Sequence, residues 1–349
     1  ILDHIEGVKE SALNEGICFG TIDTWLIWKM TNGKKHLTDF TNASRTMLYD
    51  IVNKKWDNHI LSALEIPAQI LPSVQKSSSD FGKFEYEGFE IPIGGVAGDQ
   101  QAALFGQACF EEGMAKNTYG TGCFLLMNIG KKFAQSTNGL LTTLACDDKG
   151  EVCYALEGSV FIAGAGVQWL RDGLKIIKNA SDTDDICSDI KNENDLIVVP
   201  AFAGLGAPYW DMEARGAILG ITRGTTEKQI VKATVDAIAY QTKDIINAMQ
   251  EDMKAPMKEL KVDGGAVANN YLMQFQSDIL QVPVERPEII ETTAMGAAYL
   301  AGMHVGIWDS NTILQNRKVN RKFLPNFTSD KINELYGKWQ MAIRRVMLK

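Results

Sequence analysis

The sequence lacks the residue patterns that point to a metal centre, a disulfide framework or a nucleic-acid binder. Its six cysteines are irregularly spaced with no CxxC pair, and its four histidines are scattered along the chain. These spacings argue against a zinc site and a disulfide-framed secreted domain, and they favour reduced thiols in a cytoplasmic protein. Acidic residues outnumber basic ones by 43 to 35, giving a formal net charge of −8. That excess argues against general binding to nucleic acid or to anionic membranes.

Long apolar stretches are also missing, with one apparent exception. Residues 292–308 contain no Asp, Glu, Lys or Arg, but they are rich in small residues and include His304. A spanning helix needs about 20 predominantly apolar residues, so we predict a buried helix rather than a membrane span. Several small side chains in it would allow another backbone to approach closely. These are Gly296, Ala297, Ala298, Ala301 and Gly302.

The 349 residues are 45% hydrophobic and 22% charged, which is typical of a globular protein, and the length suggests two domains. No internal repeat, charged tail or Pro/Ser linker interrupts the chain. Strand patterns alternate with helix patterns, which predicts an α/β fold with mixed sheets flanked by helices. Expected strands are 91–98, 118–128, 140–145, 152–156, 196–199 and 260–262. Expected helices are 1–16, 20–30, one beginning near 168, 228–253 and one through 272–279.

The first residues have an unusual pattern. The chain has no initiator Met, and Ile1, Leu2, Ile5 and Val8 share one helical face without a preceding cap. We therefore expect the segment to continue a helix, and we expect further residues before it.

Three glycine-rich turns follow predicted strands, where α/β folds bind ligands. The first reads GGVAGDQQ over residues 94–101 and carries Asp99 at the start of a small-residue helix. An aspartate there is either a helix N-cap, worth about 1 kcal/mol, or a catalytic carboxylate. By itself the pattern favours the cap, because N-caps greatly outnumber catalytic aspartates.

The other two turns are equally ambiguous when taken alone. NTYGTGC over residues 117–123 fits either a phosphate-binding turn with Thr121 as a donor or an ordinary hairpin. VDGGAVAN over residues 262–269 fits either a nucleotide-binding turn or a tight strand–helix connection. Neither is a Walker loop or a GxGxxG fingerprint, so P-loop and dinucleotide-binding folds are disfavoured.

The order of these segments along the chain is more specific than any one of them. The sequence reads GTIDTWLIWKMTNG from Gly20, TDFTNASRTML from Thr38, AGDQQAALFGQ from Ala97, MAKNTYGTGCFLLMN from Met114, PAFAGLGAPYWD from Pro200 and DGGAVANNYLMQFQSDIL from Asp263. Residues 216–236 fit a further signature. With these segments the chain resembles the FGGY family of carbohydrate kinases, and in particular its members that phosphorylate glycerol.

The resemblance implies two actin-like, ribonuclease H-like domains, of which the first is incomplete here. Residues 1–108 would be the rest of the glycerol-side domain and residues 109–349 the nucleotide-side domain. The implied reaction is ATP-dependent phosphorylation of glycerol to sn-glycerol 3-phosphate, with Mg²⁺, in a cleft between the domains.

The resemblance also implies roles for individual residues. Asp99 would be the catalytic base and could reach Mg²⁺ through a water molecule. Gln100 would hydrogen-bond glycerol, and Phe124 would pack against its carbon atoms. The residues implied at the nucleotide are Thr121 at the phosphates, Gly164 and Gln168 nearby, and Gly265 and Asn269 around the adenosine.

Two departures from the family qualify these roles. The family's first strand, its phosphate-binding turn and the Arg-Glu pair and aromatic residues that grip glycerol are not found in this sequence. We therefore expect that the chain alone could be inactive. Some bacterial members also bind fructose 1,6-bisphosphate through a loop ending in Arg, whereas residues 77–93 here contain no Arg. We expect weak or absent inhibition by that sugar bisphosphate.

Three alternatives remain open from the sequence. The chain could be a kinase of another polyol or sugar, such as a pentulose or gluconate. It could also be a nucleotide-binding fragment without catalysis, although retention of Asp99 argues against this. An actin-like chaperone ATPase is a weaker candidate. The family commonly forms homodimers or homotetramers, which we expect here, and we expect neither a nucleic-acid partner nor a membrane span.

Overall fold

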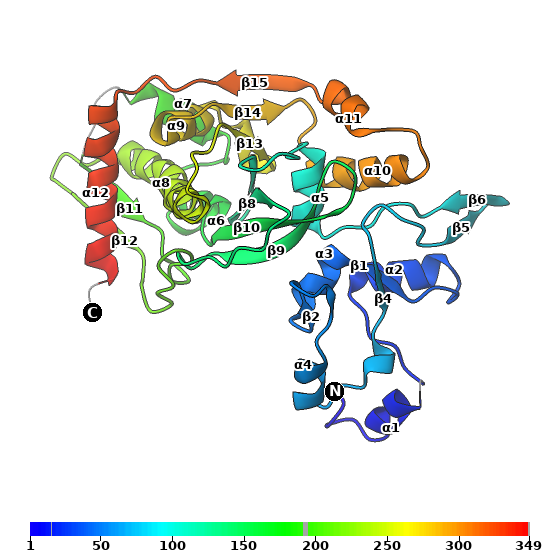
Figure 1. Ribbon diagram of the computed structural model, residues 1–349. Coiled ribbons are helices and arrows are strands. Elements are labelled where there is room, and N and C mark those ends of the chain that lie inside the picture. Colours follow the sequence, from blue (N-terminus) through cyan, green and yellow to red (C-terminus); the bar gives the residue numbers. More distant parts are fainter. Residues whose placement is uncertain (15, 191–194, 348–349) are drawn as a thin grey trace.

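The computed structural model of the protein describes residues 1–14, 16–190 and 195–347. Its centre is a mixed sheet (Figure 1). The strands are β7 (Ala115–Tyr119), β8 (Cys123–Gly130), β9 (Leu141–Cys146), β10 (Val152–Val160), β13 (Leu260–Asp263), β14 (Val284–Pro287) and β15 (Val319–Phe323). Within the described residues these seven strands run in the order β15-β14-β13-β7-β8-β10-β9. β13 pairs in parallel with β7 and β14, and the other pairs are antiparallel.

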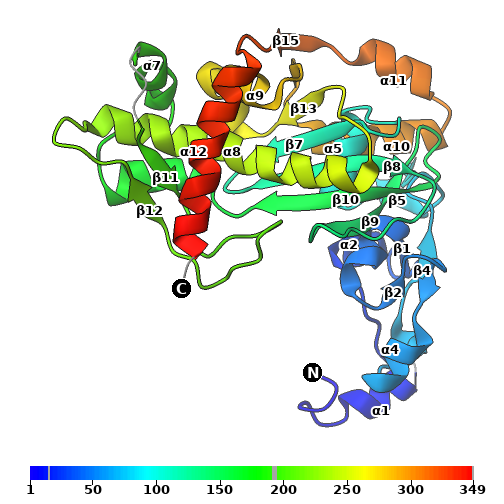
Figure 2. The same cartoon turned by 60° about the vertical axis from the view of Figure 1, so that its left-hand side comes forward.

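Helices cover both faces of this sheet. The helices at the sheet are α5 (Asp99–Gly106), α8 (Glu227–Met253) and α9 (Asn270–Leu280). α10 (Thr292–His304) packs against α5, and α12 (Ser329–Met347) packs against α9 and β11. α8 and α9 lie on one side, and α5 lies on the other with α10 against it (Figures 1 and 2). Alternation along β8 explains both faces, because Leu125 joins the core cluster that contains the α8 side chains, whereas Leu126 packs with Leu104 of α5.

Shorter elements complete this part of the chain. They are α6 (Gly164–Gln168), the π-helical turn η3 (Trp169–Gly173), α7 (Asp182–Asp189), β11 (Ile197–Val199), β12 (Ala217–Leu219), η4 (Gly265–Ala268) and α11 (Ser310–Asn316). β11 and β12 form a separate antiparallel pair. The apolar strand expected at 196–199 therefore exists, but it lies in this small sheet and not in the interior of the main one.

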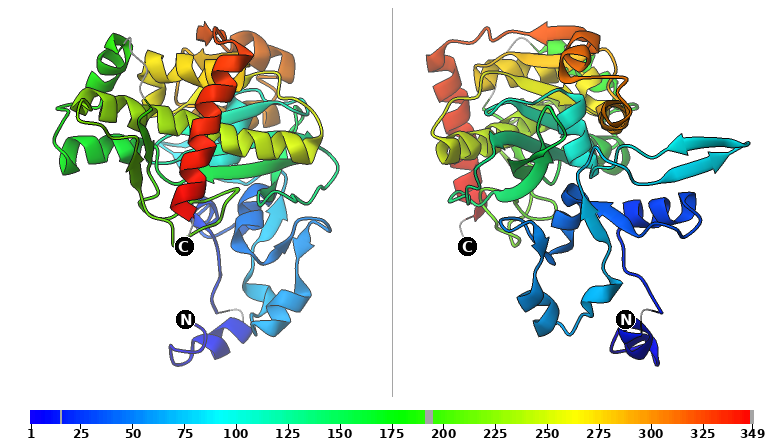
Figure 3. Two further views of the ribbon diagram at one scale, coloured as in Figure 1. Left: turned by 90° about the vertical axis from the view of Figure 1, so that its left-hand side faces the viewer. Right: turned by 45° about the vertical axis from the view of Figure 1, so that its right-hand side comes forward.

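The first hundred residues form a smaller region beside the main sheet (Figures 1 and 3). Its elements are α1 (Val8–Leu13), α2 (Ile22–Met30), β1 (Leu37–Asp39), α3 (Phe40–Ala43), η1 (Ser44–Thr46), β2 (Tyr49–Asp50), β3 (Lys55–Trp56), α4 (Asn58–Ala63), η2 (Ala68–Ile70), β4 (Ser73–Gln75), β5 (Lys83–Tyr86) and β6 (Phe89–Pro92). β1 and β4 are parallel, and the β5–β6 hairpin projects away from the body of the molecule, as Figure 3 shows.

Two expectations for this region were wrong. The apolar face of residues 1–16 predicted a continuous helix, but α1 begins only at Val8, after Gly7 with a φ of 77°. The strand expected over 91–98 ends at Pro92, inside the β5–β6 hairpin. The glycines that follow it pack against α10 instead, since a Cβ on Gly95 would lie 2.4 Å from the amide nitrogen of Ala301.

The uncharged segment near the end of the chain forms a helix, as predicted, but only one face of it is buried and the other is exposed. α10 crosses α5 so closely that a Cβ on Gly296 would overlap the backbone of Ala102. None of the helices in the described ranges is long and apolar enough to cross a membrane.

Candidate active site

Asp99 is the first residue of α5, and its carboxylate is exposed. The N-cap of this helix is Gly98, and within the described part of the chain Asp99 Oδ1 accepts a bond only from the next amide, that of Gln100, at 2.8 Å. A capping side chain would accept from an amide two or three residues further on. The N-cap interpretation of Asp99 is therefore wrong, and its carboxylate faces outward at the start of the helix.

The turn before Asp99 is fixed by the TDFTNAS segment. Thr41 Oγ1 donates to Asp39 Oδ2 and accepts from the Gly98 amide, both at 2.7 Å. Asp39 caps α3 and also accepts from the Ser77 hydroxyl. Burial raises the pKa of the Asp39 carboxyl, while these hydrogen bonds act in the opposite direction. Two segments about 60 residues apart thus set the position of the helix start.

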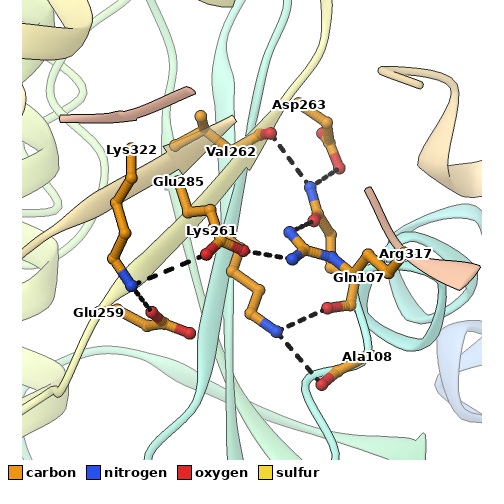
Figure 4. A network of polar contacts seen from close by, with 9 residues as sticks. All are labelled: Gln107, Ala108, Glu259, Lys261, Val262, Asp263, Glu285, Arg317 and Lys322. Atoms are coloured by element: carbon orange, nitrogen blue, oxygen red, sulfur yellow. Dashed lines mark hydrogen bonds and ion pairs between the residues drawn. The ribbon is translucent and has the colours of Figure 1, made fainter. Parts of the chain in front are cut away.

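The other end of α5 is joined to β13 through a polar network (Figure 4). Gln107 Nε2 donates to a backbone carbonyl of β13 at 3.1 Å and to Asp263 Oδ2 at 3.2 Å. Arg317 donates to Gln107 Oε1 at 2.7 Å and forms an ion pair with Glu285. The buried Lys261 ammonium donates to two carbonyls at the helix end. Because β13 leads directly into the DGG turn, the network ties the Asp99 helix to that turn.

A buried lysine lies beneath the start of the same helix. Lys116 on β7 has no exposed surface, and its ammonium donates to Gln100 Oε1 and, at 2.8 Å, to Thr118 Oγ1. Burial lowers the pKa of Lys116 to about 8, although Asp263 and Asp99 favour its charged form. The side chain is therefore mostly an ammonium ion near neutral pH.

Phe124 lies on the same side of the sheet. It is the cross-strand partner of Thr118, and directly opposed residues point to the same face. Its ring is 40% exposed, which is unusual for a phenylalanine on a central strand. The structure thus brings the three predicted glycerol-side residues, Asp99, Gln100 and Phe124, to the α5 side of the sheet.

The five residues predicted at the nucleotide line one cavity of about 270 Å³. The cavity lies between the β7–β8 turn, α6, α8 and the start of α9. Its lining includes Thr121, Gly164, Gln168, Gly265 and Asn269. The structure therefore collects residues that are spread over almost 150 positions of the sequence.

Glycines allow the walls of this cavity to approach one another. A Cβ on Gly164 would lie 2.5 Å from the Gly120 carbonyl oxygen, so α6 packs with bare backbone on the hairpin turn. Gly264 has a φ of 89°, and a Cβ there would lie 2.6 Å from the Tyr119 carbonyl oxygen. Gly265 differs, because a Cβ on it would meet open space. The structural interpretation of each turn is confirmed, since residues 120–122 connect β7 to β8 as a hairpin turn and Gly264 makes a tight strand–helix connection. Gly120, Thr121 and Gly265 also line the cavity, and binding of a nucleotide at these turns remains a prediction.

Asn269 has a structural task as well. Its Oδ1 caps α9 by accepting from the Leu272 amide at 2.7 Å, and its Nδ2 donates to Thr183 Oγ1 at 3.0 Å. The capped helix start and α7 are thereby held together at the rim of the cavity.

Sequence reasoning missed three residues of these sites. Arg171 and Thr183 line the cavity. Arg171 lies three residues after Gln168, in the segment that carried Gly164 and Gln168, whereas no sequence feature pointed to Thr183. Lys116 lies inside a segment that was singled out, but it is the second residue of β7 and precedes the strand expected to begin at residue 118, so no strand pattern marked it.

The described residues contain no group of three or more His, Cys, Asp or Glu side chains arranged to hold a metal ion. A lone exposed carboxylate such as that of Asp99 suits Mg²⁺, which commonly binds through one or two carboxylates together with substrate phosphates and water.

Comparison with known proteins agrees with this geometry. The C-terminal and N-terminal domain models of the FGGY family of carbohydrate kinases match residues 115–305 and 1–106. A glycerol kinase of Alkaliphilus metalliredigens is 59% identical over 99% of this chain and 70% of its own length. A glycerol kinase of Fusobacterium nucleatum is 57% identical with the same coverage.

The crystal structure of Plasmodium falciparum glycerol kinase with ADP superimposes with a TM-score of 0.93 and 39% identity, over 100% of this chain and 70% of that one. A xylulose kinase of Lactobacillus acidophilus shares the fold, with a TM-score of 0.80 at 22% identity over 93% of this chain and 67% of its own. The predicted fold class, α/β with mixed sheets flanked by helices, is confirmed. On these matches, the chain belongs to the FGGY family of carbohydrate kinases.

Proposed function

We propose that the chain is the greater part of a kinase that transfers the γ-phosphoryl group of ATP to glycerol, giving sn-glycerol 3-phosphate. The observation that carries this proposal is the joint placement of two sets of residues. The five nucleotide-side residues line one cavity, and the helix that begins at Asp99 is bonded at its other end to the strand leading into that cavity's DGG turn. The curated relatives at 57–59% identity are glycerol kinases, which supports glycerol as the acceptor.

Asp99 is the proposed catalytic base. Phosphoryl transfer depends mainly on positioning and on electrostatic stabilisation of the transferred group. A carboxylate at the start of α5 can accept a hydrogen bond from the attacking hydroxyl, orient it, and take its proton late in the transfer. Gln100 would donate to glycerol, and the half-exposed ring of Phe124 would pack against its carbon atoms.

The cavity is the proposed nucleotide site. The Thr121 hydroxyl lies in the exposed β7–β8 turn and would donate to the phosphates. Gly265 leaves bare backbone at the wall, against which an adenosine can lie. Gly164, Gln168 and Asn269 would form the rest of the contact surface. When bound, Mg²⁺ would neutralise charge on the phosphate oxygens, and Asp99 is the described carboxylate proposed to hold it through water.

Domain division and assembly are further parts of the proposal. We assign residues 1–108 to the glycerol side and 109–349 to the nucleotide side, which the two family models matching 1–106 and 115–305 support. We also propose a cytoplasmic homodimer or homotetramer, which light scattering of the purified protein would test.

Other acceptors define the main alternative. Kinases of xylulose and gluconate share the fold at 16–22% identity, which is evidence for the fold alone. A panel of glycerol, xylulose, other pentuloses and gluconate would separate these acceptors. A nucleotide-binding fragment without catalysis would bind ADP but turn over none of them.

The deciding experiment measures glycerol-dependent ADP release from ATP and Mg²⁺. It uses the chain as printed and the chain joined to the N-terminal segment of the Alkaliphilus metalliredigens enzyme, because the chain spans 70% of the length of the relatives that it matches. Activity with glycerol in either form supports the proposal. Retained ADP binding with no turnover of glycerol in either form contradicts it.

A further inference from the structure

Gln100 has a side chain whose two ends are nearly equal in shape and opposite in chemistry. Its amide presents either an acceptor oxygen or a donor nitrogen in a given direction, and the neighbours decide which. Here one end faces the Lys116 ammonium and the other lies 3.2 Å from Asp99 Oδ2. An ammonium can only donate, and a carboxylate can only accept. Both neighbours therefore require Oε1 toward Lys116 and Nε2 toward Asp99.

This orientation determines what the start of α5 offers to a substrate. Among the described residues, Gln100 Nε2 donates only to Asp99, so its second hydrogen remains for a ligand. Asp99 and Gln100 then present one acceptor and one donor side by side. A hydroxyl group needs this combination, since it donates one hydrogen and accepts at its oxygen. With the amide reversed, two acceptors would face a group that has a single hydrogen.

We propose that Lys116 is a positioning residue that sets the amide of Gln100 so that the Asp99–Gln100 pair recognises the attacking hydroxyl. The inference rests on the proposed function and adds a residue that does not itself touch the substrate. Lys116 suits this task because it is wholly buried and shares its face of β7 with Thr118, whose hydroxyl accepts a second bond from the ammonium. Its charge is balanced by acidic groups on three neighbouring elements, namely Asp99 on α5, Glu157 on β10 and Asp263 on β13.

A double-mutant cycle tests the proposal in whichever form of the enzyme turns over glycerol. Lys116→Met keeps the length of the side chain and removes the charge. We expect it to lower kcat/KM for glycerol by about tenfold to a hundredfold, the usual range for losing a hydrogen bond to a charged group. KM for ATP should change by less than about twofold. In a Gln100→Ala background the same substitution should cost nothing further, because its effect passes through Gln100.

Lys261→Met is the matched control. Lys261 is also buried, at 5% exposure, and lies on the adjacent strand in register with Lys116, but it bonds to backbone carbonyls. Its substitution removes a buried charge of the same kind, so any loss should be the same with Gln or Ala at position 100. A Lys116→Met effect that is equally independent of residue 100 would overturn the proposal.

Nuclear magnetic resonance of the Gln100 side-chain amide gives a readout that needs no turnover. In the unmutated chain, a strong Overhauser contact between the Nε2 protons and the Lys116 ε-methylene would place nitrogen at the ammonium and overturn the proposal. We expect that contact to be weak, and we expect the Nε2 signals to shift on Lys116→Met but not on Lys261→Met. If no acceptor is turned over, the proposed function fails, and these signals still decide the role of Lys116.

Discussion

Gly296 of α10 lies directly against the carbonyl group of Ala102 on α5. A Cβ on Gly296 would stand 1.8 Å from that oxygen, and in the reverse direction a Cβ on Gly106 would stand 2.1 Å from the Thr292 carbonyl oxygen. Real side-chain carbons do not approach backbone so closely. The two glycines therefore set the distance between the helices, and with it the position of Asp99 at the start of α5.

Gly296→Ala should consequently be severely destabilising. Overpacking a core costs about 1–3 kcal/mol and occasionally more, and a backbone oxygen cannot rotate aside as a flexible side chain can. We expect a loss of about 3 kcal/mol in the free energy of unfolding, measured by urea denaturation, because α5 and α10 must separate.

Gly337→Ala is the control for that substitution. Gly337 lies within α12, and a Cβ there would meet no atom within 4 Å. Alanine favours a helix over glycine by about 0.5–1 kcal/mol, so this variant should gain stability. If Gly296→Ala lost no more free energy of unfolding than Gly337→Ala, the α5–α10 contact would be looser than described.

The two glycines of the DGG turn should respond differently to alanine. Gly264 has a left-handed backbone and lies against Tyr119, so Gly264→Ala should lower the melting temperature. Gly265→Ala meets open space at the cavity wall, so it should leave the melting temperature nearly unchanged and weaken ADP binding. Calorimetry of unfolding and of ADP binding measures both effects. Unchanged ADP affinity in Gly265→Ala would argue against this cavity as the nucleotide site.

The sequence was most informative where its pattern extends over many residues. The period of apolar residues in 228–253 predicted α8 almost to the residue, since one buried stripe fixes a long helix. The small residues of 292–302 predicted a close helix contact, and the structure places it against α5. The helix expected over 1–16 failed because Gly7 adopts a left-handed backbone that ends the periodic face.

The sequence predicted the residues of the candidate site but not the hydrogen bonds that hold them in place. The resemblance to the family, and not the turns taken alone, identified the five predicted residues that line the cavity. The bonds from the Gly98 amide to Thr41 and from the Lys116 ammonium to Gln100 join positions 57 and 16 residues apart. No local pattern contains such pairs, since they arise only when β7 and the first region are brought beside α5. The same absence of tertiary context favoured an N-cap at Asp99.

Asp99→Asn tests the proposed base. A positioned general base contributes about 10²–10⁴-fold, so we expect turnover of glycerol to fall by that factor while ADP binding persists. Steady-state kinetics and calorimetry measure the two quantities. Asp330→Asn is a matched control, because Asp330 is also an exposed aspartate in the first turn of a helix, α12, and faces neither site. An Asp99→Asn enzyme that kept most of its turnover would contradict the assignment.

Asp244 makes the stability of the protein depend on pH in an unusual direction. It lies buried in α8, where it accepts from the Tyr336 hydroxyl at 2.6 Å and the Trp339 indole at 2.8 Å. Burial raises the pKa of its carboxyl to about 6, and these two bonds oppose the rise only in part. The folded chain therefore retains a proton that the unfolded chain releases near pH 4. This group's stabilising contribution is complete below pH 4 and is lost as the pH rises through 6.

Asp244→Asn should remove that dependence, because an amide resembles the protonated acid and keeps an oxygen for Trp339. A difference of about two pKa units corresponds to about 3 kcal/mol. We expect the stability of the variant relative to the parent to increase by about that amount between pH 4 and pH 7, measured by urea denaturation at each pH. Asp252→Asn should show the opposite dependence and at lower pH, because the stability that ionised Asp252 contributes is present above about pH 4 and is lost as the pH falls through its lowered pKa. Burial opposes ionisation of Asp252, but hydrogen bonds from residues 136–138 outweigh it and lower the pKa of its carboxyl. The prediction fails if the difference in free energy of unfolding between the parent and Asp244→Asn stays constant from pH 4 to pH 7. The Asp244 carboxyl would then titrate alike in the folded and unfolded chains.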